Sequence, residues 1–147
     1  MNTPENVKLL DAYYRLVANG SKNQNADSNA YAQFFSEALD MLMDHCHDQA
    51  KAMGWHDTRR EDGTMIALIH SELSEALEGL RKGRADEHLP HRLNAEVELA
   101  DAIIRIMDFA GLKGYDIGGA VIEKLEYNRH RADHKRENRA KDGGKKW

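Results

Sequence analysis

The fold is decided first by residues 64–82, which read TMIALIHSELSEALEGLRK. Apolar residues recur in this stretch every three or four positions, the spacing that places side chains on one face of an α-helix. A glycine follows at position 83, and glycine is the residue that most often ends a helix. The stretch therefore predicts a helix from about Thr64 to Lys82. Its apolar face consists of Leu68, Ile69, Leu73, Ala76, Leu77 and Leu80.

The same helical period continues on both sides of this stretch. We expect one helix over about 28–53 and another over about 90–110, with Pro90 at its start and Gly111 as its end. A further helix begins near Asp116, whose side chain can cap the first turn. The apolar face of the helix over 90–110 comprises Leu93, Val97, Ala100, Ile104 and Met107, widened by Leu99, Ile103 and Ile106.

The chain divides into three parts by composition. We predict a helical arm over about 3–19, followed by a polar linker, within residues 1–28. The main helical domain is predicted over residues 29–135, and a basic tail over residues 136–147. No segment shows the alternation typical of a strand. We predict an all-α fold, a bundle of four to five helices.

Composition narrows the class of protein further. The chain has 147 residues, of which 41% are hydrophobic and 31% charged, so a core this modest favours completion by oligomerisation. The net charge of −4 argues against general nucleic-acid binding. A single cysteine, Cys46, favours a reducing compartment, and no apolar run approaches a membrane span or a signal peptide. We expect a cytoplasmic protein with no membrane partner.

Two acidic pairs stand out on the predicted helices. Glu72 and Glu75 are three residues apart, as are Glu98 and Asp101, so each pair lies on one helix face with Cβ atoms about 5–6 Å apart. Packing the two helices side by side would gather four carboxylates. Oxygen ligands without cysteine or histidine favour a hard cation, Mg²⁺ or Mn²⁺.

Each carboxylate also has a simpler interpretation. Glu72 falls inside the apolar face of its helix, where a carboxylate must be metal-bound or paired with an arginine or lysine. Asp101 borders the apolar face of the following helix, whereas Glu98 is expected further toward solvent. A solvated helix face would explain both. Glu96, near the middle of the widened face, could be a ligand, an ion-pair partner or an interface residue.

The histidines do not form a recognisable metal motif. A di-iron bundle requires Glu-x-x-His on two helices, and neither acidic motif ends in histidine. His45 and His47 are two residues apart and face different directions on a helix. We therefore expect the histidines to be surface residues.

Three segments in order complete a larger pattern. Residues 69–78 contain E-x-x-E, residues 98–105 contain E-x-x-D, and residues 124–131 contain K-x-x-x-N-x-x-R. Together they resemble the MazG-like all-α nucleoside triphosphate pyrophosphohydrolases over roughly residues 45–147. The sequence departs from that family at Ser71, where many members carry an additional glutamate.

The resemblance implies a reaction and roles for particular residues. A nucleoside triphosphate, expected to be a deoxynucleotide, would be hydrolysed to a monophosphate and pyrophosphate by a homodimer or homotetramer. Glu72, Glu75, Glu98 and Asp101 would hold Mg²⁺, with Mn²⁺ as a substitute, and Glu75 or Glu72 would act as the base. The phosphates would be bound by Lys124, Asn128 and Arg131.

Trp55, in the segment Gly54-Trp55-His56-Asp57, resembles an aromatic residue that stacks on the base in some relatives. It could equally cap the bundle core.

Two other classes of protein remain open. One is a helical dimeric binding module whose basic C-terminal tail binds nucleic acid or an acidic partner. The other is a structural helical protein with solvated glutamates, for which loss of Glu72 would be tolerated. The enzyme hypothesis expects no stable nucleic-acid partner.

Overall fold

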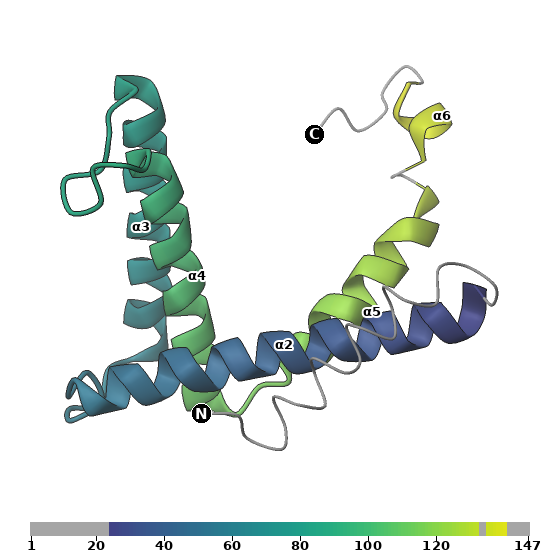
Figure 1. Cartoon of the computed structure of the whole chain (residues 1–147), viewed down its shortest axis with the longest axis horizontal. Helices are drawn as coiled ribbons and strands as arrows, with labels where there is room; N and C mark the ends of the chain where they lie inside the picture. Colours follow the sequence, from purple (N-terminus) through teal and green to yellow (C-terminus); the bar gives the residue numbers. More distant parts are fainter. Residues whose placement is uncertain (1–23, 133–134, 141–147) are drawn as a thin grey trace. The chain divides into compact units, whose positions relative to one another are not determined.

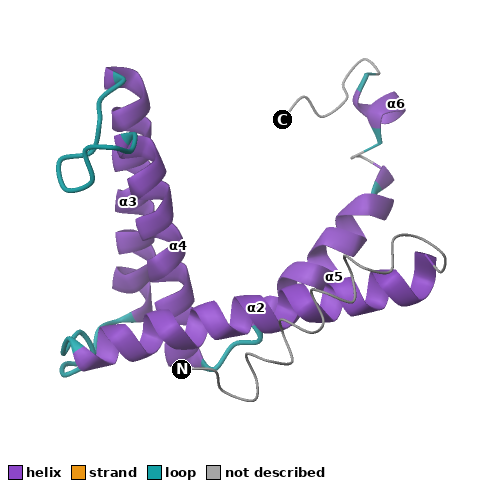
Figure 2. Cartoon of the chain, viewed as in Figure 1, coloured by secondary structure: helices purple, strands orange, loops and turns teal. Residues whose placement is uncertain are grey.

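The computed structural model describes residues 24–132 and 135–140. These residues are helical apart from their connections and contain no strand, only an isolated bridge between Ala85 and Leu93 (Figure 2). The prediction of an all-α chain is thereby confirmed for the described part. The helices are α2 (Gln24–Ala52), α3 (Asp62–Lys82), α4 (Asn94–Lys113), α5 (Ile117–His130) and the short α6 (Arg136–Arg139). The arm expected over 3–19 lies outside the described residues.

The chain divides into two compact units, which we describe separately. One unit comprises residues 41–115 and therefore contains the end of α2 together with α3 and α4. The other comprises residues 1–40 and 116–147, with the first part of α2, α5 and α6. Every predicted carboxylate ligand lies in the unit 41–115.

Helices α3 and α4 pack side by side as an antiparallel hairpin (Figure 1). Small residues line their contact, because Ala76, Ala95 and Ala102 are 3%, 7% and 3% exposed. A Cβ atom on Gly79 would lie only 2.4 Å from Oδ1 of Asn94, so glycine permits the close approach at one end. At the other end Lys113 Nζ lies 2.8 Å from Asp62 Oδ2.

Most of the long aliphatic side chains of this hairpin face outward, contrary to the predicted apolar faces. Leu73 and Leu77 on α3 are 44% and 48% exposed, and Leu99 and Ile103 on α4 are 48% exposed each. Of the predicted set on α3, Ile69 and Ala76 are buried. The hairpin closes through small and polar residues, which leaves the aliphatic face uncovered in the single chain.

The predicted limits of α4 are also wrong. Pro90 lies in a turn, and the helix begins at Asn94 because the preceding loop closes on itself, with hydrogen bonds from Asp86 N to Arg92 O and from Asn94 N to Arg84 O. The helix continues through position 111 and ends at Gly114, which has the positive φ of +65° that favours glycine.

The predicted linker is partly helical, since α2 begins at Gln24 rather than near Ser28. Its residues 24–28 include weak helix formers but neither glycine nor proline, the two residues least favourable within a helix, so α2 extends through them.

The unit that contains α5 confirms the predicted cap at Asp116. Its side chain accepts a hydrogen bond of 2.7 Å from the backbone N–H of Gly119. The N–H of Gly118 donates to Asp40 Oδ1 on α2 over 3.3 Å, which joins α5 to α2 within this unit. No described helix has both the length and the apolar character needed to cross a membrane.

Candidate functional site

Three of the four predicted carboxylates meet between α3 and α4. Glu72 from α3 and Glu98 and Asp101 from α4 each offer an oxygen, and these three oxygens lie within 4.8 Å of one another. Glu72 and Glu98 are 7% and 9% exposed, and Asp101 is half-buried. The expectation that Glu98 faces solvent is wrong, because α4 turns this residue toward α3. We refer to Glu72, Glu98 and Asp101 as the carboxylate cluster.

The cluster concentrates negative charge where water is scarce. Burial raises the pKa of Glu98, and the neighbouring charges of Glu75, Glu72 and Asp101 raise it further, against a hydrogen bond from Asn94 that lowers it. Burial, followed by the charge of Glu72, likewise raises the pKa of Asp101. Both groups therefore resist ionisation, and a divalent cation between them would remove that penalty.

Arg105 is the one arginine bonded to this cluster among the described residues. Its Nε donates to Glu72 Oε1 over 2.6 Å, so the ion pair considered for Glu72 from the sequence is present. One guanidinium balances one of three carboxylates and leaves Glu98 and Asp101 without an ion pair in the described part of the chain. Arg105 lies one helical turn after Asp101, so the sequence placed it on the acidic face of α4, but its partner Glu72 could not be read from that spacing.

Glu75 lies apart from the three converging oxygens. Its side chain is exposed, and it acts on the cluster through its charge, as one of the causes that raise the pKa of Glu98. It therefore stands at the solvent side of the site.

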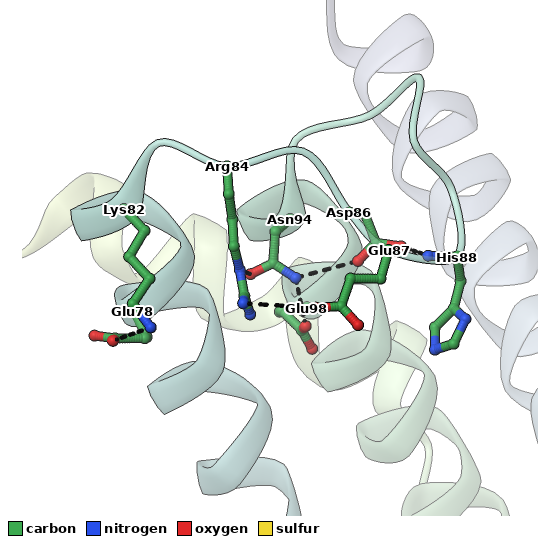
Figure 3. A network of polar contacts seen from close by, with 8 residues as sticks. All are labelled: Glu78, Lys82, Arg84, Asp86, Glu87, His88, Asn94 and Glu98. Atoms are coloured by element: carbon green, nitrogen blue, oxygen red, sulfur yellow. Dashed lines mark hydrogen bonds and ion pairs between the residues drawn. The ribbon is translucent and has the colours of Figure 1, made fainter.

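A polar network behind Glu98 was not anticipated from the sequence (Figure 3). Asn94, 3% exposed, donates through Nδ2 to Glu98 Oε1 over 2.8 Å and to Asp86 Oδ2 over 3.1 Å, and its Oδ1 accepts from Arg84 Nε over 3.3 Å. Because the Nδ2 group lies between two carboxylates, the orientation of the amide is fixed. Asn94 therefore holds Glu98 in place.

Asp86 anchors this network to the loop before α4. Its Oδ1 accepts hydrogen bonds from the backbone N–H groups of His88 and Leu89, at 2.9 and 2.8 Å. Those bonds, with the one from Asn94, lower the pKa of Asp86. Glu96, whose role the sequence left open, accepts from the backbone N–H of Leu93 over 3.3 Å and so caps α4. It is also an ion-pair partner, since its Oε2 lies 3.9 Å from Arg92 Nη1.

The donors of the carboxylate cluster suit a hard divalent cation. They are carboxylate oxygens only, from helices α3 and α4, and burial together with neighbouring negative charge raises the pKa of Glu98 and of Asp101. Mg²⁺ and Mn²⁺ prefer such oxygens, and Mg²⁺ is usually held by few protein carboxylates and completes its shell with water and phosphate.

A pocket of about 290 Å³ adjoins the cluster. Asp101 and Arg105 lie in its wall, together with Trp55, which is 48% exposed. The guanidinium carbon of Arg60 lies 5.0 Å from the centre of a Trp55 ring. The structure therefore places Trp55 and one predicted metal ligand on the same pocket.

The predicted phosphate-binding residues lie on α5 and directly after it, in the other unit. Lys124 Nζ and the guanidinium carbon of Arg131 lie 4.6 and 5.8 Å from the ring centre of Tyr127. Asn128 Oδ1 is buried and has no hydrogen-bond partner among the described residues. The three residues thus share one short segment of the chain.

Comparisons with known proteins add no assignment. No family model matches the chain, and neither the curated proteins nor the solved structures that were compared contain a match.

Proposed function

We propose that the chain is a metal-dependent pyrophosphohydrolase of the MazG-like type. It hydrolyses a nucleoside triphosphate, in particular a deoxynucleotide, to the monophosphate and pyrophosphate. The observation that carries this proposal is the convergence of Glu72, Glu98 and Asp101, from two helices, on one point. The three-part sequence pattern supplies the reaction class.

The residues around the cluster have separate tasks in this reaction. Bound Mg²⁺, or Mn²⁺ in its place, would neutralise phosphate charge and lower the pKa of a bound water. Arg105 orients Glu72, and Asn94 orients Glu98, so two of the three ligands are held before substrate arrives. Glu75, on the solvent side, takes up the proton of the attacking water, with Glu72 as the other candidate base.

Trp55 supplies a surface for the base. Its half-exposed ring borders the pocket that Asp101 also lines. Stacking a base on an aromatic ring contributes about 1–3 kcal/mol and tolerates any base. For Lys124, Asn128 and Arg131, the proposed role in binding phosphates rests on the K-x-x-x-N-x-x-R pattern. It is supported by Asn128 Oδ1, which is buried without a hydrogen-bond partner in the part of the chain that the structure describes.

The exposed aliphatic face of the α3–α4 hairpin supports assembly as a homodimer or homotetramer. Three residues on each helix share the spacing i, i+4, i+7 and are all at least 38% exposed: Leu73, Leu77 and Leu80 on α3, and Leu99, Ile103 and Ile106 on α4. An apolar patch of this extent marks an interaction surface. A second copy would cover it with an identical face.

The proposal is tested by incubating the purified protein with each of the eight common NTPs and dNTPs, with Mg²⁺ or with a chelator, and resolving the products. We expect monophosphate and pyrophosphate in equal amounts, only with the metal. If no nucleotide is turned over with either Mg²⁺ or Mn²⁺, the proposed reaction is wrong. Release of orthophosphate would point instead to attack at the γ-phosphorus.

A further inference from the structure

A second polar cluster, of different composition, lies in the unit 41–115. It consists of His47 on α2, His56 in the loop after α2, and Asp108 on α4. Asp108 Oδ1 lies 2.9 Å from His47 Nδ1 and 2.7 Å from His56 Nε2. Their side chains are only 15–18% exposed, so the expectation that these histidines are surface residues is wrong.

The three side chains present their polar atoms to a single point. One nitrogen from each imidazole and one oxygen of Asp108 all lie within 4.8 Å of one another. The two rings meet edge to face, with centres 5.0 Å apart and planes at 64°. In each neutral imidazole the proton can move to the other ring nitrogen. The nitrogen that faces Asp108 then offers a lone pair to a metal ion.

The spacing of these atoms is close to that of metal ligands. Tetrahedral ligands about 2.0–2.1 Å from Zn²⁺ are about 3.3 Å apart. The two nitrogen–oxygen separations of 2.9 and 2.7 Å would need to widen by only about half an ångström.

Helix α4 has a glycine, Gly111, at the point where His47 packs against it. A Cβ atom on residue 111 would lie 2.7 Å from Cβ and 2.9 Å from Cγ of His47, so Gly111 allows the imidazole to lie against the helix. The three ligating residues come from α2, the following loop and α4. A cation bound to all three would therefore connect three separate segments of this unit.

We propose that His47, His56 and Asp108 form a binding site for a divalent transition metal, Zn²⁺ in the first place, separate from the carboxylate cluster. Two imidazoles and a carboxylate are borderline-soft donors that suit Zn²⁺ and related ions, whereas Mg²⁺ prefers the all-oxygen cluster. Three protein ligands leave the fourth position to water. Asp108 lines the same pocket as Asp101, so that position opens toward solvent.

Co²⁺ is the probe, because tetrahedral and octahedral Co²⁺ differ in visible absorption. The chelator-treated full chain is titrated with Co²⁺ in excess Mg²⁺, followed by Zn²⁺. We expect the intense bands of tetrahedral Co²⁺ to saturate at one equivalent per chain, to persist with Mg²⁺ and to disappear with one equivalent of Zn²⁺. Absence of these bands in the wild-type protein overturns the proposal.

Variants identify the ligands. His56→Gln and Asp108→Asn should weaken Co²⁺ binding by more than about 100-fold, since loss of a residue that merely supports a ligand already costs 10–100-fold. His45→Gln, at an exposed position of α2, is the matched control and should keep the bands. Circular dichroism verifies folding of each variant.

Two results for the variants would contradict the assignment. If folded His56→Gln retains the bands, the nitrogen ligand is elsewhere. If Glu98→Gln loses the bands while His56→Gln keeps them, the ion occupies the carboxylate cluster. Because the readout is absorption and not turnover, failure here leaves the proposed hydrolysis unaffected.

Discussion

Helix α4 contributes to two polar clusters about two turns apart, and they differ in their donors. At Glu98 and Asp101 it meets Glu72 of α3, so that cluster holds three carboxylates and one arginine, Arg105. At Asp108 it meets His47 and His56, so that cluster holds one carboxylate and two imidazoles. In the first cluster, burial and then the neighbouring negative charges raise the pKa of Glu98 and of Asp101. In the second cluster, the single carboxylate forms hydrogen bonds with both imidazoles.

On the two proposals above, one helix would hold two kinds of cation. Donor type, rather than the number of acidic residues, separates a site for Mg²⁺ from a site for Zn²⁺. Each cluster also depends on a glycine behind it. Gly79 leaves room for Asn94, which holds Glu98, and Gly111 leaves room for His47.

Replacing a ligand of the carboxylate cluster should reduce catalytic activity far more than replacing an acidic residue outside it. Glu98→Gln should lower kcat/KM at least about 100-fold, because a neutral amide replaces a metal ligand while its oxygen can still accept from Asn94. Glu87→Gln is the control, since that side chain is 81% exposed in the loop before α4. Initial rates of pyrophosphate release at saturating Mg²⁺ measure both. More than about a tenth of wild-type turnover in Glu98→Gln would remove this residue from the site.

A smaller effect, on stability, is expected from substituting the two glycines that lie behind the clusters. A methyl group at position 79 would lie 2.4 Å from Asn94 Oδ1 and 3.1 Å from Ala95 N, and one at position 111 would lie 2.7 Å from His47 Cβ. Gly79→Ala and Gly111→Ala should each lower the free energy of unfolding by about 1–3 kcal/mol. Urea titration measures the change.

Gly63→Ala is the control for both glycines. It lies in the first turn of α3, where a methyl group would meet nothing within 4 Å beyond its chain neighbours and the backbone of its own helix. The substitution should therefore be neutral or stabilising by up to about 1 kcal/mol. If all three variants behave alike, close packing behind the clusters does not matter to stability.

A smaller effect than these is a pH dependence of stability, which should have opposite signs for Glu98 and Asp86. The native pKa of Glu98 is raised, so the folded chain binds this proton more tightly than the unfolded chain does. The free energy of unfolding therefore falls as the pH rises from the ordinary pKa, about 4.3, through the raised one. Without metal, Glu98→Gln should accordingly raise the Tm at pH 7 and leave it unchanged near pH 4.

Asp86 should show the reverse. Hydrogen bonds from Leu89 N and the Asn94 side chain lower its native pKa, so its contribution to stability is complete above the ordinary pKa and disappears as the pH falls through the lowered one. Asp86→Asn should lower the Tm at pH 7 and have progressively less effect in acid. Melting curves by circular dichroism in chelator test both, and the same sign for the two variants would contradict the assigned electrostatics.

The sequence predicted those features of the fold that depend on residues within one or two turns of each other in the same helix. The period of apolar residues around Leu68 and Ile69 predicted α3, and Gly83 predicted its end. Asp116 was identified as a cap because capping is a contact between residues three apart. The prediction of a helix start at Pro90 was wrong. The residues before Asn94 form a loop in which Asp86 accepts hydrogen bonds from the backbone N–H groups of His88 and Leu89.

Helical spacing alone was enough to predict the all-α class, the two acidic pairs and the anomalous burial of Glu72. The tertiary structure decided which carboxylates converge, because the rotation of α4 against α3 buries Glu98 and leaves Glu75 exposed. It also decided that Arg105 pairs with Glu72 and that His47 and His56 meet at Asp108, whereas Asn94 and Glu98 lie only one turn apart on α4. The partners of Glu72 and of Asp108 lie on other segments of the chain, and only the packing of those segments sets the distances that bring them together.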